Sequence, residues 1–399
     1  SENVTYKGAE EITKDTTISS GEYESTNSDE NAILVSGDIT SSLSNITVTK
    51  KGDSTSADGS SFYGNNSAVL AKSGATLTLD NINVTTSSNG ANGVFSYGGS
   101  ATTNNSNSDG TNVTISNSKI TTTGDNAGGI MTTGGGKTTA NNLTINTSGT
   151  SSAAIRSDRG GGTVTVNKGT YTTAGTGSPS IYSTADITVN NATLVSKASE
   201  GIVIEGKNKV TINNTKLTDS NTKLNGQSTT YKNIFLYQSM SGDASTGTAE
   251  FTSKDSDIVT NNGDTFYVTN TTATINLTNN KITNNDSKGN FLRVQKDSWG
   301  NSGSNGGDVT LNMTNQEADG EIVIDSISTL TMNLKEKTLF TGKINSENSA
   351  KSIKLVLDKT SKIKLTGDSY ISSLEDEDSS YDNIDFNGYK LYVNGTAIN

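Results

Sequence analysis

The 399-residue chain is predicted to be all-β and to fold as a right-handed parallel β-helix solenoid of about ten coils with N- and C-terminal caps. The main observation is a short pattern written three times in succession, each copy opening with Ser-x-x-Ile at Ser152, Ser178 and Ser199. Each copy continues into an alternating apolar run, at 164–166, 187–189 and 210–212. A period of about 20–30 residues indicates a solenoid, in which one unit cannot bury its apolar face alone and stacks on its neighbours.

The composition supports this prediction and excludes several classes of function. Only 30% of the residues are hydrophobic, but they are largely β-branched and alternate, which indicates strands, and there is a single proline. The absence of cysteine excludes disulfides and thiolate metal sites, and the absence of histidine removes the commonest general base. A net charge of −11 disfavours nucleic acid and anionic membranes as partners.

Two further features concern the compartment. No run of about 18 apolar residues occurs, so no membrane insertion is expected in this segment. The chain opens at SENVTY without a signal peptide, which fits a mature or trimmed product and gives no argument for the cytosol.

Three regions are expected: an N-terminal cap at 1–30, a β-helix with inserted loops at 31–320, and shorter, more charged coils with a C-terminal cap at 321–399. Within the central region a four-residue strand recurs whose second residue is always apolar and should face inward. These strands are 32–35, 68–71, 93–96, 129–132, 154–157, 180–183, 201–204, 233–236, 265–268 and 291–294.

A polar corner should follow the second strand of each coil. The residues at this position are Asn81, Asn117, Thr147, Lys168, Asn191, Asn214, Asn279 and Asn315. Asparagine tolerates the left-handed conformation, and its side-chain amides can form a hydrogen-bonded ladder from coil to coil.

The third residue of each first strand should face outward, and these positions hold large apolar, aromatic and arginine side chains rather than Thr or Ser. We name this series the outward stripe: Leu34, Leu70, Phe95, Met131, Arg156, Tyr182, Val203, Phe235, Tyr267 and Arg293. Long loops at 97–110, 237–247 and 296–307 emerge after the same strand. Either the loops or the N-terminal segment bury the stripe, or the stripe and its flanking loops form a ligand groove.

The ligand-binding candidates come from this stripe and its loops. The stripe supplies Phe95, Arg156, Tyr182, Phe235, Tyr267 and Arg293, and the loops supply Tyr97, Tyr237 and Trp299. Flat aromatic rings can stack on sugar faces, and Tyr and Trp are also common anchors of protein interfaces. These residues could therefore bind a sugar or anchor a protein partner.

Charged candidates for catalysis are few. Asp158, Thr184 and Glu205 should align on three successive coils, which would place the two carboxylates about 9–10 Å apart, at the wide end for an inverting glycosidase. The alternative is an ordinary surface pair of Asp158 with Arg156. No enzyme activity and no cofactor are expected. The acidic run 375–378 is read as a solvated loop, with calcium binding as the weaker alternative.

Three segments, GSPSIYSTADITV, SEGIVIEGKNKVTINN and LTGDSYISSL…NIDFNGYKLYVNG, carry a resemblance to a known family. The chain resembles right-handed parallel β-helix proteins of the pectin-lyase-like superfamily, and more narrowly the adhesin-like or carbohydrate-binding β-helix proteins of Gram-positive gut bacteria. The resemblance implies a secreted or cell-surface protein and a glycan or host-surface ligand. The function expected is therefore an extracellular adhesin-like binding module, acting as a monomer. The alternatives are a polysaccharide lyase or glycoside hydrolase on a β-helix, and a passive stalk or spacer.

Overall fold

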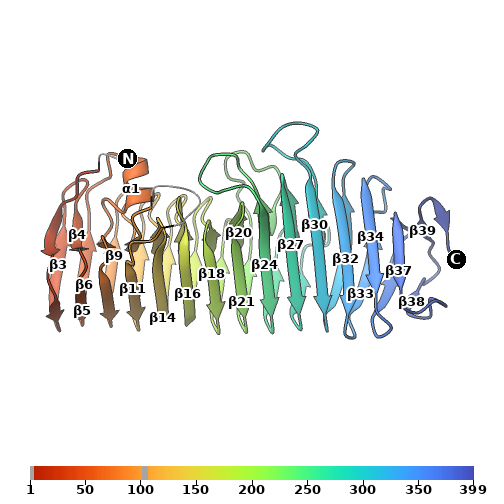
Figure 1. Ribbon diagram of the computed structural model, residues 1–399, viewed down its shortest axis with the longest axis horizontal. Helices are drawn as coiled ribbons and strands as arrows, with labels where there is room; N and C mark the ends of the chain where they lie inside the picture. Colours follow the sequence, from red (N-terminus) through yellow and green to blue (C-terminus); the bar gives the residue numbers. More distant parts are fainter. Residues whose placement is uncertain (1–3, 101–106) are drawn as a thin grey trace.

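The computed structural model describes residues 4–100 and 107–399, and there the chain forms a parallel β-helix (Figure 1). The coils lie side by side along one long axis, with the two termini at opposite ends. The helix α1 (Ala57–Tyr63) and the long loops project from the same edge of the stack. Residues 101–106 of the loop expected at 97–110 lie outside the described residues.

The first sheet runs the length of the molecule and has fifteen parallel strands within the described residues. In order they are β1 (Gly8–Ile12), β4 (Asn31–Ser36), β7 (Val69–Lys72), β10 (Val94–Tyr97), β13 (Ile130–Thr133), β15 (Ile155–Ser157), β17 (Ile181–Ser183), β20 (Ile202–Glu205), β23 (Lys232–Tyr237), β26 (Asp264–Thr269), β29 (Leu292–Val294), β31 (Glu317–Ile324), β33 (Leu339–Ile344), β35 (Lys362–Leu365) and β38 (Ile384–Asp385).

The second sheet wraps the other sides of the coils, because most coils contribute two consecutive strands to it. Its strands are β2 (Thr16–Ile18), β3 (Gly21–Ser25), β5 (Thr40–Ser44), β6 (Ile46–Lys50), β8 (Thr76–Asp80), β9 (Asn83–Thr86), β11 (Asn112–Ser116), β12 (Lys119–Thr122), β14 (Gly136–Thr147), β16 (Gly162–Thr173), β18 (Asp186–Asn190), β19 (Thr193–Ser196), β21 (Lys209–Asn213), β22 (Lys216–Asp219), β24 (Thr248–Lys254), β25 (Asp257–Thr260), β27 (Thr271–Thr278), β28 (Lys281–Asn284), β30 (Gly307–Thr314), β32 (Thr329–Lys335), β34 (Ser352–Leu357) and β37 (Ser373–Asp376).

A small third sheet closes the C-terminal end of the described chain. It contains β36 (Ser369–Ile371), β39 (Leu391–Val393) and β40 (Thr396–Ala397). The pairing of β39 with β40 is antiparallel, unlike the parallel pairing of the two long sheets.

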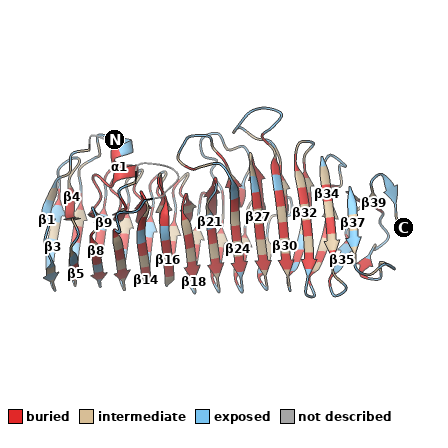
Figure 2. Cartoon of the chain, viewed as in Figure 1, coloured by how far each residue is buried: buried red, intermediate tan, exposed pale blue. Residues whose placement is uncertain are grey.

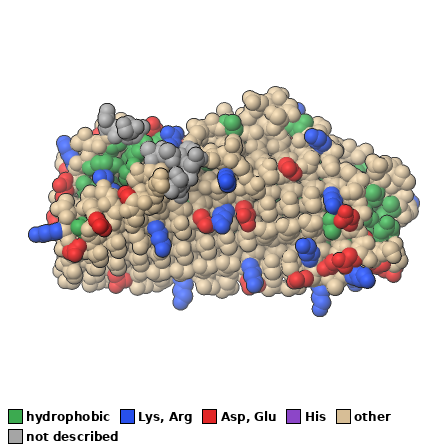
Figure 3. Space-filling view, viewed as in Figure 1, with side chains coloured by type: hydrophobic (Ala, Val, Ile, Leu, Met, Phe, Trp, Pro, Cys, Tyr) green, Lys and Arg blue, Asp and Glu red, His purple; other side chains and the backbone are tan. Residues whose placement is uncertain are grey.

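The core is one continuous cluster of inward-facing side chains, as the alternation of the strands predicts. Figure 2 shows the buried residues recurring along the strands of successive coils. Ile155, Ile181 and Ile202 are aligned on β15, β17 and β20, and all three are fully buried. The all-β parallel solenoid predicted from the sequence is thereby confirmed. On the face seen in Figure 3, most side chains are uncharged and acidic and basic side chains are scattered among them.

The corners are also largely as predicted. Asn81, Asn117, Asn191 and Asn214 have φ angles between 45° and 56°, in the left-handed region. The Asn214 amide donates to Asn191 Oδ1 at 2.7 Å, so neighbouring corners bond to each other. The prediction of Thr147 as a corner was wrong.

Thr147 instead ends β14, and the corner of that coil lies inside the strand at Asn142, with φ 57°. A second amide ladder was not foreseen. It runs through Asn141, Asn167, Asn190 and Asn213 at donor–acceptor distances of 2.9–3.1 Å. These residues face outward, Asn190 and Asn213 at the ends of their strands and Asn141 and Asn167 inside β14 and β16. A polar side chain at such a position gives no signal of its own in so polar a sequence.

The segments expected as caps also contribute coils. In the range 1–30, β1, β2 and β3 pair in parallel with β4, β5 and β6 of the next coil. In the range 321–399, β33, β35 and β38 continue the first sheet. The fifteen strands of that sheet therefore exceed the roughly ten coils expected, because the terminal coils are too irregular in sequence to match the repeat.

Candidate functional site

The outward stripe has the register that the sequence predicts. Each of its residues pairs with the next along the first sheet, from Leu34 with Leu70 through Arg156 with Tyr182 to Tyr267 with Arg293. Most of these side chains are buried beneath inserted segments, in two separate clusters.

The N-terminal cluster contains Leu34, Leu70, Phe95 and Met131, all at most 6% exposed. The N-terminal segment and α1 lie over it: the Tyr6 hydroxyl donates to the Tyr63 carbonyl oxygen at 2.9 Å, and the Tyr63 and Tyr97 rings meet edge to face with centroids 5.6 Å apart. Gly64 ends α1 against this cluster, since a Cβ there would lie 2.4 Å from Leu70 Cδ1. Phe95, a predicted ligand-binding residue, therefore lies in a covered core, and Tyr97 packs on it.

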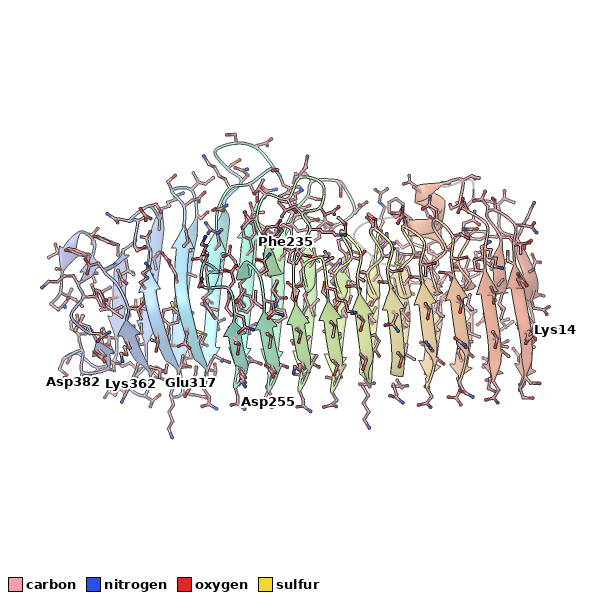
Figure 4. The ribbon with its side chains drawn as sticks, turned by 180° about the vertical axis from the view of Figure 1, so that it is seen from behind. Lys14, Phe235, Asp255, Glu317, Lys362 and Asp382 are labelled. Carbon is pink, nitrogen blue, oxygen red and sulfur yellow. The ribbon has the colours of Figure 1, made fainter. Side chains whose placement is uncertain are left out.

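The C-terminal cluster contains Val203, Phe235 and Tyr267, with Tyr182, Tyr237 and Trp299 packed against them. Figure 4 labels Phe235 at the loop-bearing edge of the coils, opposite the edge where Asp255 lies. Phe235 is 3% exposed and Tyr267 is fully buried, so neither ring presents a face to a ligand while the loops stay in place. Tyr182, Tyr237 and Trp299 are only partly buried.

The rings of this cluster form one connected group. The Phe235 and Tyr237 rings stack with centroids 4.2 Å apart, and Trp299 meets the Tyr237 ring edge to face at 5.1 Å. The predicted residues Tyr182, Phe235, Tyr237, Tyr267 and Trp299 are thus brought together, whereas Phe95 and Tyr97 belong to the other cluster.

A cavity of about 170 Å³ lies between these rings and the loop at 220–231. Its apolar walls are Pro179, Tyr182, Val203, Phe235, Tyr237 and Trp299, and its polar side chains are Ser199, Glu200, Asn225, Gln227 and Ser228. Pockets that hold drug-sized ligands measure about 300–1,000 Å³, so this smaller cavity admits a group of about one ring.

Several of these cavity residues were missed from the sequence. Pro179 and Glu200 both occupy the second position of the Ser-x-x-Ile pattern, where the preceding copy has Ala153. A carboxylate at a position that is apolar in the other two copies was the available signal. The loop residues gave no comparable signal, because Asn, Gln and Ser are ordinary in so polar a chain.

The two arginines of the stripe are engaged in ion pairs. Arg293 Nε lies 2.8 Å from Asp264 Oδ2, and its Nη1 donates to Gln295 Oε1 at 3.2 Å. Arg156 Nη2 lies 3.1 Å from Asp158 Oδ2, with side-chain exposures of 11% and 9%. The pair of Asp158 with Arg156, considered as the alternative to a catalytic role, is therefore present, but it is largely buried and does not lie on the surface.

The catalytic alternative rested on Asp158 and Glu205, and both are buried. Thr184 lies between their coils, and its hydroxyl donates to the Asp158 carbonyl oxygen at 2.9 Å. Glu205 accepts hydrogen bonds from the hydroxyls of Tyr182 and Ser239. Burial raises the pKa of Glu205, although these hydrogen bonds oppose the shift.

The charged residues around Asp158 and Glu205 also hold two inserted segments in place. Arg159 Nη2 pairs with Asp243 of the loop at 2.7 Å, and its guanidinium carbon lies 4.2 Å from the centroid of Phe62 in α1. Ser239, which bonds Glu205, belongs to the same loop as Asp243. Contacts of Arg159 and Glu205 thus connect their coils with the loop at 238–247 and with α1.

The pH dependence of stability tests whether Asp158 is buried as described. Burial raises the pKa of Asp158 from 3.8 to about 7, and the charge of Arg156 opposes the shift. Because the folded protein holds this proton more tightly than the unfolded chain, the stabilisation is complete below about pH 4 and is lost as the pH rises through 7. We expect the unfolding free energy to fall by up to about 1.4 kcal/mol per pH unit in this window, and Asp158→Asn to reduce that slope. Chemical denaturation at several pH values measures it, and equal slopes in both proteins would contradict the assignment.

The acidic run expected as a solvated loop lies partly in β37, and Asp378 accepts a hydrogen bond from the Ser380 hydroxyl at 2.6 Å. Over residues 4–100 and 107–399, no three Asp or Glu side chains gather as a metal site would require. Among the residues described, no helix has the length and apolar character that crossing a bilayer demands. Comparison with protein-family models, with curated proteins and with solved structures finds no match to this chain.

Proposed function

We propose that the chain is an extracellular, adhesin-like binding module that recognises a glycan through the cavity between the C-terminal ring cluster and the loop at 220–231. The resemblance to surface β-helix proteins supports the location and the class of ligand. The cavity's size supports recognition of a single sugar unit, such as one at the end of a chain, rather than of an extended polymer.

The observation that carries this proposal is that aromatic rings and hydrogen-bonding side chains line the same small cavity. The partly exposed rings of Tyr182, Tyr237 and Trp299 offer flat apolar faces, and Glu200, Asn225 and Gln227 offer hydrogen-bonding groups beside them. A sugar ring needs both, because its C–H faces pack on aromatic rings while its hydroxyls require donors and acceptors.

Replacing Trp299 with alanine should weaken glycan binding roughly thirty-fold, the effect of losing an anchor ring worth about 2 kcal/mol. A glycan array identifies the ligand, and calorimetry on the best hit compares the affinities of wild-type and variant protein. The matched control is Tyr389→Ala, because Tyr389 is 37% exposed near the C-terminus, far along the chain from the cavity. This control should bind like the wild type.

Equal affinity in Trp299→Ala and wild type would remove the cavity as the glycan site. Retained binding to a host surface protein would then favour protein recognition by the loops. Absence of any ligand across both screens would favour the passive stalk.

A polysaccharide lyase or hydrolase is the second candidate, and the raised pKa values of Asp158 and Glu205 favour it, because a general acid works best with a pKa near the working pH. Against it, both carboxylates are buried and hold loop contacts. Release of reducing or unsaturated sugar by the wild type but not by Glu205→Gln would overturn the binding-module proposal.

A further inference from the structure

The cavity beneath the loop at 220–231 has a charged group of one sign only on its walls. Glu200 is the single charged side chain among the described residues that line it, and none of those residues is a lysine or an arginine. The other polar side chains of the walls are uncharged: Ser199, Asn225, Gln227 and Ser228. A ligand in the cavity therefore meets a carboxylate and no cationic group.

The amine that pairs with Glu200 is hidden from the cavity. Lys232 Nζ lies 3.5 Å from Glu200 Oε2 in an ordinary buried ion pair, but Lys232 is fully buried and does not line the cavity. Its Nζ lies 4.4 Å from the centroid of the Phe235 ring and 5.2 Å from that of Tyr267, and both contacts favour the charged amine. The pair thus presents its negative end to the cavity and keeps its positive end against aromatic rings.

The Glu200 carboxylate retains capacity to accept a hydrogen bond from a ligand. Its Oε1 accepts from the Ser199 hydroxyl at 2.7 Å and its Oε2 faces Lys232, whereas an ionised carboxylate has about four lone-pair positions and no proton to donate. The hydroxyl groups of an uncharged sugar can donate to such an oxygen. A carboxylate on the sugar has no proton to offer and adds a second negative charge.

A second buried carboxyl group acts in the same direction. The Tyr182 hydroxyl donates to Glu205, which is 1% exposed, so Glu205 lies at the end of a ring that lines the cavity. Burial raises the pKa of Tyr237, another lining ring, well above its usual value, and the charges of Glu205 and Glu200 add to the shift. Both carboxylates therefore disfavour a further negative charge among these rings, where water screens little.

We infer that the cavity selects an uncharged sugar unit, whose hydroxyl donates to Glu200, and excludes sugars that carry a carboxylate, such as sialic and uronic acids. This inference rests on the proposed glycan-binding function and names the class of ligand for the same cavity. Burying an acidic sugar beside Glu200 costs free energy, because no cation on the cavity walls pairs with it. Juxtaposed like charges are an effective means of rejecting a wrong partner.

A glycan array that holds neutral and acidic glycans tests the inference on the full chain, with wild type and Trp299→Ala screened side by side. The glycans whose binding depends on Trp299 should end in an uncharged sugar. Calorimetry then compares the best of them with the glycan in which C6 of the terminal sugar is oxidised to a carboxylate, as in galactose and galacturonic acid. The acidic form should bind at least about ten-fold more weakly.

A charge added to the cavity wall should relax this exclusion. Gln227→Lys places an amine on the wall and should narrow the difference between the two glycans about three-fold, the effect of a partly exposed ion pair. The matched control is Thr222→Lys, because Thr222 is exposed on the same loop but does not line the cavity. This control should leave the difference unchanged, and an equal effect of both variants would overturn the assignment of the exclusion to the cavity.

The outcomes separate this inference from the proposed function. An acidic glycan that binds as tightly as its neutral form, and whose binding is lost in Trp299→Ala, would overturn the inference and leave the glycan-binding proposal standing. Glycans that bind Trp299→Ala as tightly as the wild type, or the absence of any bound glycan, would overturn the proposed cavity site and this inference with it.

Discussion

Ile181→Asp is expected to destabilise the fold by about 4–5 kcal/mol or more, because it places an unpaired charge in the continuous core. Ile181 is fully buried and stacks between Ile155 and Ile202 on the neighbouring coils. A carboxylate there has no partner and must either stay charged in an apolar column or take up a proton. Both outcomes also disturb the packing of the adjacent coils.

The measurement is the denaturation midpoint followed by circular dichroism, with Thr188→Asp as the matched control. Thr188 lies on β18 of the same coil, is only partly buried, and pairs with outward-facing Thr165 and Thr211. The same substitution there should change stability by no more than about 0.5 kcal/mol. Similar midpoints for the two variants would mean that the inward and outward positions have been exchanged.

Phe235→Ala is expected to destabilise the protein by about 3–5 kcal/mol, the range for truncating a buried aromatic residue. Phe235 is 3% exposed and contacts the rings of Tyr237, Tyr267 and Trp299, which come from two coils and one loop. Its removal leaves a cavity beneath the loop, and the loop can fill that space only by giving up its own contacts.

This substitution also separates the two readings of the outward stripe. If the outward stripe is buried beneath the loops, Phe235→Ala should cause a large loss of stability. Ligand affinity per folded molecule should then change only through the altered cavity walls. If the outward stripe is exposed and binds ligand, the substitution should weaken binding and leave the denaturation midpoint unchanged. Tyr389→Ala again serves as the control, since an exposed aromatic side chain should cost little. An unchanged midpoint for Phe235→Ala would show that the loop does not cover the stripe in solution.

The sequence alone determined the coil and its register. Strand side chains alternate with a period of two, so an apolar residue at the second position of each first strand assigns every neighbour to the inside or the outside. Ile155, Ile181 and Ile202 were therefore recognisable as core, and Arg156, Tyr182 and Val203 as one outward row. The asparagine corners were readable for a similar reason, because few residues tolerate the left-handed backbone they adopt.

Only the tertiary structure decided what lies over the outward row. The covering loops are rich in Gly, Ser and Asn, and such segments have no periodicity from which a direction can be inferred. Whether Trp299 packs on Tyr237, 62 positions earlier, depends on how the loop after β29 lies against the end of β23. The same holds for Glu200 and Lys232, whose charged atoms lie 3.5 Å apart although the two residues belong to different coils. The alternation of apolar and polar residues along a strand predicts which way each side chain points. Contacts made by the loops, in contrast, form only once the coils have stacked.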